Sequence, residues 1–244
     1  GDRLGYLSGE DYARRLTTSA EASRWTVFKS HDGDAFFRRA MAGGHTRVLY
    51  AYRDVRDVIF SLMHKRGLTF ERILQQGMVH QIHRNDRFWT RGRHVLIQKY
   101  EDLIDDPTTG VAQIAAHLGI AIELDEATSI ALEYSAASNR ARIESLQASL
   151  RESGVDLADA ANQQICDPKT LLHWNHLRPP RTETWRELAT PGQRRILERC
   201  FGDWLEAHGY PRDTSHAEIN RPSVGERLRD ELNLIRGWTS CRLH

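Results

Sequence analysis

The chain has 244 residues, of which 40% are hydrophobic and 27% are charged, and its formal net charge is +1. A chain of this length and composition can bury a core large enough for one α/β domain. The small net charge, with Asp and Glu interleaved among the many Arg, argues against a general polyanion binder, so no nucleic acid partner is expected.

The three cysteines, Cys166, Cys200 and Cys241, are widely spaced and form neither a zinc motif nor an obvious disulfide framework. This pattern fits a reducing compartment. No secretory segment and no apolar run of about 18 residues is apparent. We therefore expect a cytoplasmic protein without a membrane span, of unknown oligomeric state.

The first predicted elements are a short helix over residues 11–16 and a strand over residues 24–31, which ends in a loop at Asp32–Gly33. Lys29 and His31 are two residues apart, so they project from the same face of that strand. A His can accept a proton near neutral pH, and a Lys can neutralise charge on a leaving oxygen. The pair suits transfer of a charged group to a hydroxyl, although a His at a strand end is more often a surface residue.

The next segment combines a predicted helix over residues 34–42, ended by Gly43–Gly44, with a buried strand over residues 48–52. Together with the preceding strand, they form a β–α–β unit. Such units favour a right-handed crossover and a parallel sheet.

Arg53 stands between this strand and a helix that begins near Val55. A strand that leads into a helix N-terminus often binds phosphate, because free N–H groups and the helix dipole attract an anion. Arg53 would add a bidentate fork. Ser61 lies four residues beyond Asp57 on the same helix face, so its hydroxyl could reach the same anion. An Asp-capped helix with a solvated Arg explains this segment equally well.

The remaining elements are predicted from periodicity and end signals. They are a long helix over 69–91, a strand over 95–99, a helix over 108–118, two helices within 124–150, a long loop over 154–180, a helix from Thr190–Pro191 to about Leu205, and a helix over 224–235. These boundaries divide the chain into a domain over residues 1–212 and a C-terminal tail over residues 213–244.

Two pairs of histidines, His80 with His83 and His173 with His176, are each three residues apart. Neither pair has Cys or Glu at zinc-site spacing, so no metal is predicted. The first pair is expected to face solvent or a substrate cleft. The second pair flanks Trp174, which is expected to anchor the long loop, although the segment could also line an acceptor site.

Four segments, in this order and spacing, resemble the sulfotransferases that use 3′-phosphoadenosine 5′-phosphosulfate (PAPS). They are Val27–His31, Tyr52–Ser61, Val95–Leu103 with Asp106–Pro107, and the region from Arg178 through Trp185 and Thr190 to Tyr210. Each segment alone is a weak match, but together they cover most of residues 25–210. The resemblance implies an α/β fold of the P-loop-kinase-like type, a three-layer structure with a parallel sheet flanked by helices.

The resemblance also implies a reaction, the transfer of a sulfonate group from PAPS to an acceptor hydroxyl or amine. His31 would be the catalytic base, and Lys29 would contact the bridging oxygen and the sulfonate. The nucleotide would leave as 3′-phosphoadenosine 5′-phosphate (PAP), and no metal would be required. The acceptor could be a small molecule, a carbohydrate or a peptide.

For the nucleotide, the resemblance implies four binding residues. Arg53 and Ser61 would hold the 3′-phosphate, Tyr100 would lie beside the adenine, and Arg178 would close over the 3′-phosphate from a C-terminal loop. By the residues alone, Tyr100 could be only the last strand residue before a helix, and Arg178 only a solvated loop charge.

Two features depart from the family pattern. The glycine-containing loop that cradles the 5′-phosphosulfate is absent, since the chain opens at Gly1–Asp2 past its expected place. The family's Arg-Lys-Gly is Arg178–Pro179–Pro180 here, and prolines cannot donate N–H groups. We expect that an N-terminal strand and loop are missing, and that residues 1–244 alone are nearly inactive. The alternatives are a non-catalytic module that binds a nucleotide or a partner, and a nucleotide-dependent kinase, although no Walker-type loop is present.

Overall fold

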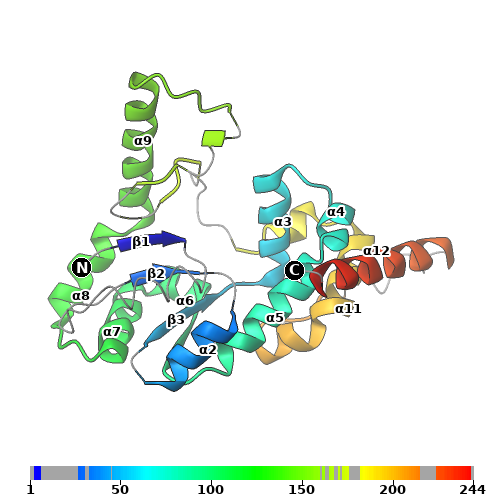
Figure 1. Cartoon of the computed structure of the whole chain (residues 1–244), viewed down its shortest axis with the longest axis horizontal. Helices are drawn as coiled ribbons and strands as arrows, with labels where there is room; N and C mark the ends of the chain where they lie inside the picture. The colour runs from blue at the N-terminus through cyan, green and yellow to red at the C-terminus, as the bar shows by residue number, and fades with distance from the viewer. Residues whose placement is uncertain are drawn as a thin grey trace. The chain divides into compact units, whose positions relative to one another are not determined.

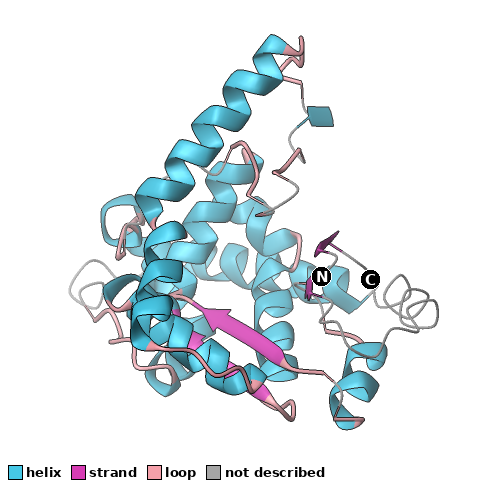
Figure 2. Cartoon of the chain, turned by 90° about the vertical axis from the view of Figure 1, so that its left-hand side faces the viewer, coloured by secondary structure: helices cyan, strands magenta, loops and turns pink. Residues whose placement is uncertain are grey.

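The computed structural model describes residues 3–6, 27–30, 33–44, 46–159, 161–162, 165–167, 170, 172–175, 182–214 and 224–242 (Figure 1). The chain divides into two compact units. The first unit comprises Gly1–Leu49, Gly92–Leu96 and Asp102–Pro180, and the second comprises Tyr50–Arg91, Ile97–Glu101 and Arg181–His244. The described residues are mostly helical, and the strands are short (Figure 2).

The first unit opens with two parallel strands, β1 (Arg3–Tyr6) and β2 (Val27–Lys29). Arg3 lies opposite Val27 and Tyr6 opposite Lys29, with an irregular register between Leu4 and Tyr6. The strand predicted around Lys29 is confirmed, whereas β1 was not predicted. The helix expected over residues 11–16 lies outside the described residues.

Helix α2 (Ala35–Ala42) follows β2, as predicted. The carboxylate of Asp34 accepts the backbone N–H of Phe37 at 2.9 Å and caps the helix N-terminus. Phe37 and Met41 are buried one turn apart, and the helix ends at Gly43. The chain then enters β3 (Val48–Tyr52), which pairs with β4 (Val95–Lys99) in a second two-stranded sheet.

The structure describes α6 (Tyr100–Asp105), α7 (Pro107–Leu118), α8 (Leu124–Glu133) and α9 (Ala136–Glu152) as the next helices after β4. Helices α7 and α8 pack against each other. Helix α7 ends as predicted at Gly119, which adopts a left-handed φ of 72°. The two helices predicted within residues 124–150 are confirmed.

The described part of the loop after α9 is anchored through Trp174, as expected. The indole Nε1 of Trp174 donates to the carbonyl of Asn162 at 2.8 Å, and Gln147 on α9 donates to the carbonyl of Trp174 at 2.8 Å. Cys166 and His173 form an isolated antiparallel bridge in the same loop. His176 lies outside the described residues.

The second unit contains α3 (Val55–Arg66), α4 (Phe70–Gln75), α5 (Met78–Thr90), α10 (Trp185–Leu188), α11 (Pro191–Ala207) and α12 (Val224–Arg242). The single helix predicted over residues 69–91 is wrong, because Gly77 adopts a left-handed φ of 72° that separates α4 from α5. Helix α11 starts with the predicted Thr190 cap, completed by Gln193 into a capping box.

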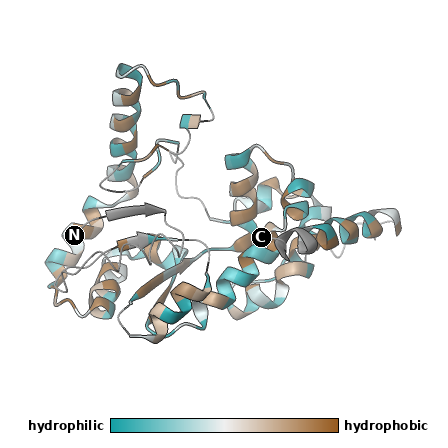
Figure 3. Cartoon of the chain, viewed as in Figure 1, coloured by the Kyte–Doolittle hydropathy of each residue, from teal (hydrophilic) through white to brown (hydrophobic). Residues whose placement is uncertain are grey.

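One hydrophobic core holds this unit together. Figure 3 shows that its helices carry both hydrophobic and hydrophilic residues, as expected of helices that bury one face. The buried residues are Val55, Ile59, Phe60, Phe70, Ile73, Leu74, Met78, Val79, Trp185, Ala189, Ile196, Leu197, Phe201, Leu205 and Tyr210. The core therefore joins α3, α4, α5, α10 and α11, although α10 and α11 lie far from the others in sequence.

Helix α12 packs on α4 and α5 within the same unit. Gln75 donates to the side chain of Asn233 at 2.9 Å, and both groups are partly buried. Gly237 lies so close to α4 that an added Cβ would meet the carbonyl oxygen of Leu74 at 2.0 Å. The C-terminal residues that the structure describes are therefore part of a packed helical unit.

His80 and His83 do not occupy the solvent or cleft positions that the sequence suggested. The His80 Nε2 lies 3.2 Å from the Leu234 carbonyl, and the His83 Nε2 lies 2.9 Å from the Cys200 carbonyl. Both rings are half-buried against other helices of the unit. Within the described ranges, no group of three or more His, Cys, Asp or Glu could hold a metal. None of the helices described is both long enough and apolar enough to cross a membrane.

Candidate functional site

Arg53 occupies the junction between β3 and α3. Asp54 caps α3, since its carboxylate accepts the backbone N–H of Arg56 at 2.9 Å. The Arg53 guanidinium donates to the carboxylate of Asp57 at 3.2 Å, one turn into the helix. The Arg53 side chain is 25% exposed. The bond to Asp57 therefore orients the Arg53 guanidinium. The exposed part of the side chain can still contact an anion.

Tyr100 lies beside Arg53. The guanidinium carbon of Arg53 is 4.9 Å from the centroid of the Tyr100 ring. Tyr100 is the first residue of α6 and directly follows β4, the strand that pairs with β3. Residues that follow two neighbouring strands can approach each other, and here they combine a cation with an aromatic face.

Asp57 connects this junction to a distant segment. Its side chain is 1% exposed, and its two oxygens accept the backbone N–H groups of Glu183 at 2.9 Å and Trp185 at 3.0 Å. Burial raises the pKa of the Asp57 carboxyl, although the Trp185 N–H and the Arg53 guanidinium act in the opposite direction. The Asp57 carboxylate thus accepts hydrogen bonds both from the Arg53 guanidinium and from the backbone of Glu183 and Trp185.

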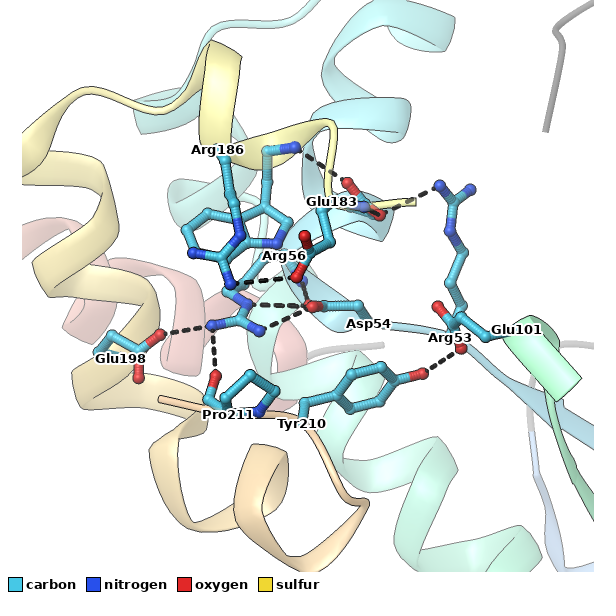
Figure 4. Close-up of polar contacts among 11 residues, drawn as sticks. Arg53, Asp54, Arg56, Glu101, Glu183, Arg186, Glu198, Tyr210 and Pro211 are labelled. Carbon is cyan, nitrogen blue, oxygen red and sulfur yellow. Dashed lines mark hydrogen bonds and ion pairs between the residues drawn. The ribbon is translucent and has the colours of Figure 1, made fainter. Parts of the chain in front are cut away.

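Arg56 is buried in an ion cluster (Figure 4). Its guanidinium donates to Asp54 at 2.7 Å, to Glu198 at 2.9 Å and to the Pro211 carbonyl at 3.0 Å. It also lies 4.0 Å from the ring centroid of Trp185. Burial alone would lower the pKa of Arg56, but the Asp54 and Glu198 carboxylates outweigh it and hold the pKa above its usual value. With 1% of its side chain exposed, Arg56 belongs to the interior of the unit and is not accessible to a ligand.

Tyr210 links the end of β4 to the segment after α11. Its hydroxyl donates to Glu101 at 2.6 Å, and the Lys99 ammonium lies 4.3 Å from the centroid of its ring. Burial and the Glu101 carboxylate raise the pKa of the Tyr210 hydroxyl, so it remains a proton donor at neutral pH. Lys99 and Glu101, the sequence neighbours of Tyr100, are therefore both in contact with Tyr210.

Ser61 and Lys29 are the other predicted site residues that the structure describes. Ser61 is exposed on α3, four residues after Asp57 and roughly 6 Å further along the helix axis. Lys29, the last residue of β2, is exposed in the first unit. His31 and Arg178 lie outside the described residues. Of the six predicted residues, the structure thus brings Arg53 and Tyr100 into contact.

The sequence profile of a family described as the sulfotransferase domain matches residues 4–207. The chain belongs to this family. The resemblance carried by the four sequence segments is thereby confirmed. No sequence among the curated proteins matches the chain.

Solved structures of sulfotransferase folds are similar to this domain. Mouse sulfotransferase SULT7A1, complexed with PAP, superposes with a TM-score of 0.56 at 16% identity, over 95% of this chain and 80% of that one. Retinol dehydratase with retinol and PAP gives 0.55 at 18% identity, and its complex with androsterone and PAP gives 0.51 at 16% identity. Each of these two matches covers 88% of this chain and 64% of retinol dehydratase, less than two thirds of its length. These similarities confirm the predicted α/β fold.

Sequence reasoning missed the residues that hold the candidate site around Arg53 together. Arg56 lies in the segment Tyr52–Ser61, one of the four that resemble the family. Nothing in the sequence predicts that it pairs with Glu198, which lies 142 residues away. Trp185 was noted only as part of the C-terminal resemblance, and its contacts with Arg56 and Asp57 depend on tertiary packing. The one available signal was chemical: an Asp that follows a strand-end Arg by four residues is well placed to pair with it.

Proposed function

We propose that the chain transfers a sulfonate group from PAPS to an acceptor hydroxyl or amine. The observation that carries this proposal is the contact of Arg53 with Tyr100 in a member of the sulfotransferase family. The proposal assigns the 3′-phosphate to Arg53 and the adenine to Tyr100. Both groups belong to one nucleotide, so residues that bind them must lie close together, and the 4.9 Å contact meets that requirement.

The chemistry of the Arg53 junction fits a bound phosphate. The guanidinium stands at the N-terminus of α3, where backbone dipoles favour an anion. Asp57 holds it in one orientation, so little side-chain freedom would be lost on binding. We assign the hydroxyl of Ser61, exposed on the same helix, to a second phosphate contact. Arg178 would supply a further cation.

In the proposed reaction, His31 removes the proton of the acceptor as its oxygen or nitrogen attacks sulfur. Lys29 neutralises the negative charge that develops on the phosphate oxygen as the sulfur–oxygen bond of PAPS breaks. The proton ends on His31, and PAP leaves. The catalytic domain would span residues 1–212, in a cytoplasmic protein.

The proposed acceptor is a small-molecule alcohol. The retinol dehydratase structures contain retinol or androsterone beside PAP, and both molecules are small apolar alcohols. We propose small-molecule alcohols as the first class to test, before carbohydrates and peptides. Residues 172–175, which include Trp174, are candidates for acceptor contacts because they precede Arg178 in the same loop.

Calorimetry with PAP and with adenosine 5′-phosphate, which lacks the 3′-phosphate, tests the nucleotide assignment. The proposal requires that PAP binds more tightly. Incubation with PAPS labelled in its sulfonate group and a panel of alcohols, amines, sugars and peptides then tests transfer. Equal affinity for the two nucleotides would refute recognition of the 3′-phosphate. Transfer by residues 1–244 would exclude the non-catalytic module and would overturn the expectation that these residues alone are nearly inactive.

A further inference from the structure

We infer that Asp57 is a positioning residue for the donor nucleotide, because it connects the guanidinium of Arg53 to the backbone of residues 183–185. The order of that segment and the binding of a 3′-phosphate at Arg53 would then depend on each other. This inference rests on the proposed function and adds a residue that does not itself touch the donor.

The hydrogen bonds of Asp57 form a junction between two segments. One carboxylate oxygen accepts from both the Arg53 guanidinium, at 3.2 Å, and the Glu183 N–H, at 2.9 Å. The other oxygen accepts the Trp185 N–H at 3.0 Å. The side chain is 1% exposed, so water cannot replace these partners readily. A charged carboxylate makes all three bonds stronger than a neutral acceptor would.

The backbone of Glu183 supports the same conclusion. Glu183 has a φ of 57°, in the left-handed region that residues other than glycine rarely adopt. Such a conformation persists only where surrounding contacts hold it. The hydrogen bond from the Glu183 N–H to Asp57 is such a contact. Loss of the Asp57 carboxylate is therefore expected to release residues 183–185 as a group.

Asp57→Asn is the informative substitution, since Asn has nearly the same size but turns an N–H₂ group toward backbone donors. We expect PAP affinity to fall by about 5- to 150-fold, the usual range of coupling between two sites. Affinity for adenosine 5′-phosphate should change much less. The matched control is Asp106→Asn, which alters the exposed carboxylate that caps α7 and accepts the Thr109 N–H at 3.0 Å.

A double-mutant cycle separates positioning from general damage to the fold. If Asp57 acts through Arg53, Asp57→Asn should weaken PAP binding much less in an Arg53→Ala background than in the wild type. Additive losses, or equal losses for PAP and adenosine 5′-phosphate, would overturn the inference. The melting temperature of each variant, without nucleotide, shows whether the fold is retained.

Hydrogen exchange of the wild-type chain provides a test that needs no variant. PAP should slow amide exchange in the peptide that contains Glu183 and Trp185, and adenosine 5′-phosphate should slow it less. PAP binding without added protection there would overturn the coupling and leave the proposed function intact. A wild-type chain that binds no PAP would overturn both, and this outcome is visible before any substitution is made.

Discussion

The guanidinium of Arg56 donates to the carboxylate of Glu198, 142 residues further along the chain, at 2.9 Å. The same guanidinium bonds Asp54 and lies over the ring of Trp185. Both carboxylates are buried, with 3% of Asp54 and 8% of Glu198 exposed. One arginine side chain therefore ties the N-terminus of α3 to α10 and α11, next to the junction where Arg53 lies.

Arg56→Met should destabilise the protein strongly, because it leaves two buried carboxylates without their cation. Removal of one partner of a buried ion pair typically costs about 3–5 kcal/mol in the free energy of unfolding. Urea denaturation measures the change. The control is Arg212→Met, which removes an arginine from an ion pair with the fully exposed Asp203 and should have little effect. A small loss for Arg56→Met would show that the cluster contributes little to stability.

Arg53→Ala should weaken PAP binding by about 1.5–3 kcal/mol, the usual value of a hydrogen bond to a charged group. Its effect on adenosine 5′-phosphate should be small, since that nucleotide lacks the 3′-phosphate. Calorimetry with the two nucleotides gives both values. Arg47→Ala serves as the control, because Arg47 is half-buried and donates to the Gly44 carbonyl in the first unit. Equal losses for both nucleotides would mean that Arg53 does not bind the 3′-phosphate.

His31→Ala should lower the turnover number by about 100-fold or more, as expected for the loss of a general base. PAP affinity should be nearly unchanged, because the proposed role concerns the acceptor proton alone. The measurement is the rate of transfer from PAPS at saturating acceptor, with His94→Ala as a control at an exposed histidine. Near-normal turnover of the His31 variant would exclude this residue as the base.

Two glycines on α12 make a matched pair for testing how this helix packs. Gly237→Ala would place a Cβ 2.0 Å from the Leu74 carbonyl oxygen, so α12 would have to move away from α4. Overpacking of this kind costs about 1–3 kcal/mol. Gly225→Ala meets no atom within 4 Å and should stabilise the helix by up to about 1 kcal/mol. Thermal denaturation should therefore shift in opposite directions, and shifts of the same sign would contradict the observed packing.

Stability should fall below about pH 6.5 in a way that depends on His83. Burial lowers the pKa of His83 from its ordinary value of 6.5, and nearby Arg87 and His80 act in the same direction, whereas the Cys200 carbonyl and Asp86 oppose it. As the pH falls, the unfolded state takes up this proton first, so the free energy of unfolding decreases. His83→Gln keeps a donor for Cys200 but cannot titrate. Its unfolding free energy should vary less with pH than that of the wild type.

Local sequence patterns were sufficient to predict most of the elements and the position of Arg53 between a strand and a helix. Gly43 and Gly119 ended helices where predicted, and Thr190 began one, since caps depend on a few adjacent residues. Arg53 was identified because strand, cation and helix start follow one another directly. The break at Gly77 was missed, because a glycine inside a periodic helical segment does not by itself show that it adopts a left-handed φ.

The sequence by itself determined the family, most of the strands and helices, and the residue types at the junction of β3 and α3. Only the tertiary structure decided which of those residues meet. Asp57 bonds an N–H that is 128 residues away, and Arg56 bonds Glu198 across 142 residues. Such pairings carry no local signal, because they follow from how the helices bury their apolar faces around one core, and the buried charges must then find partners within it.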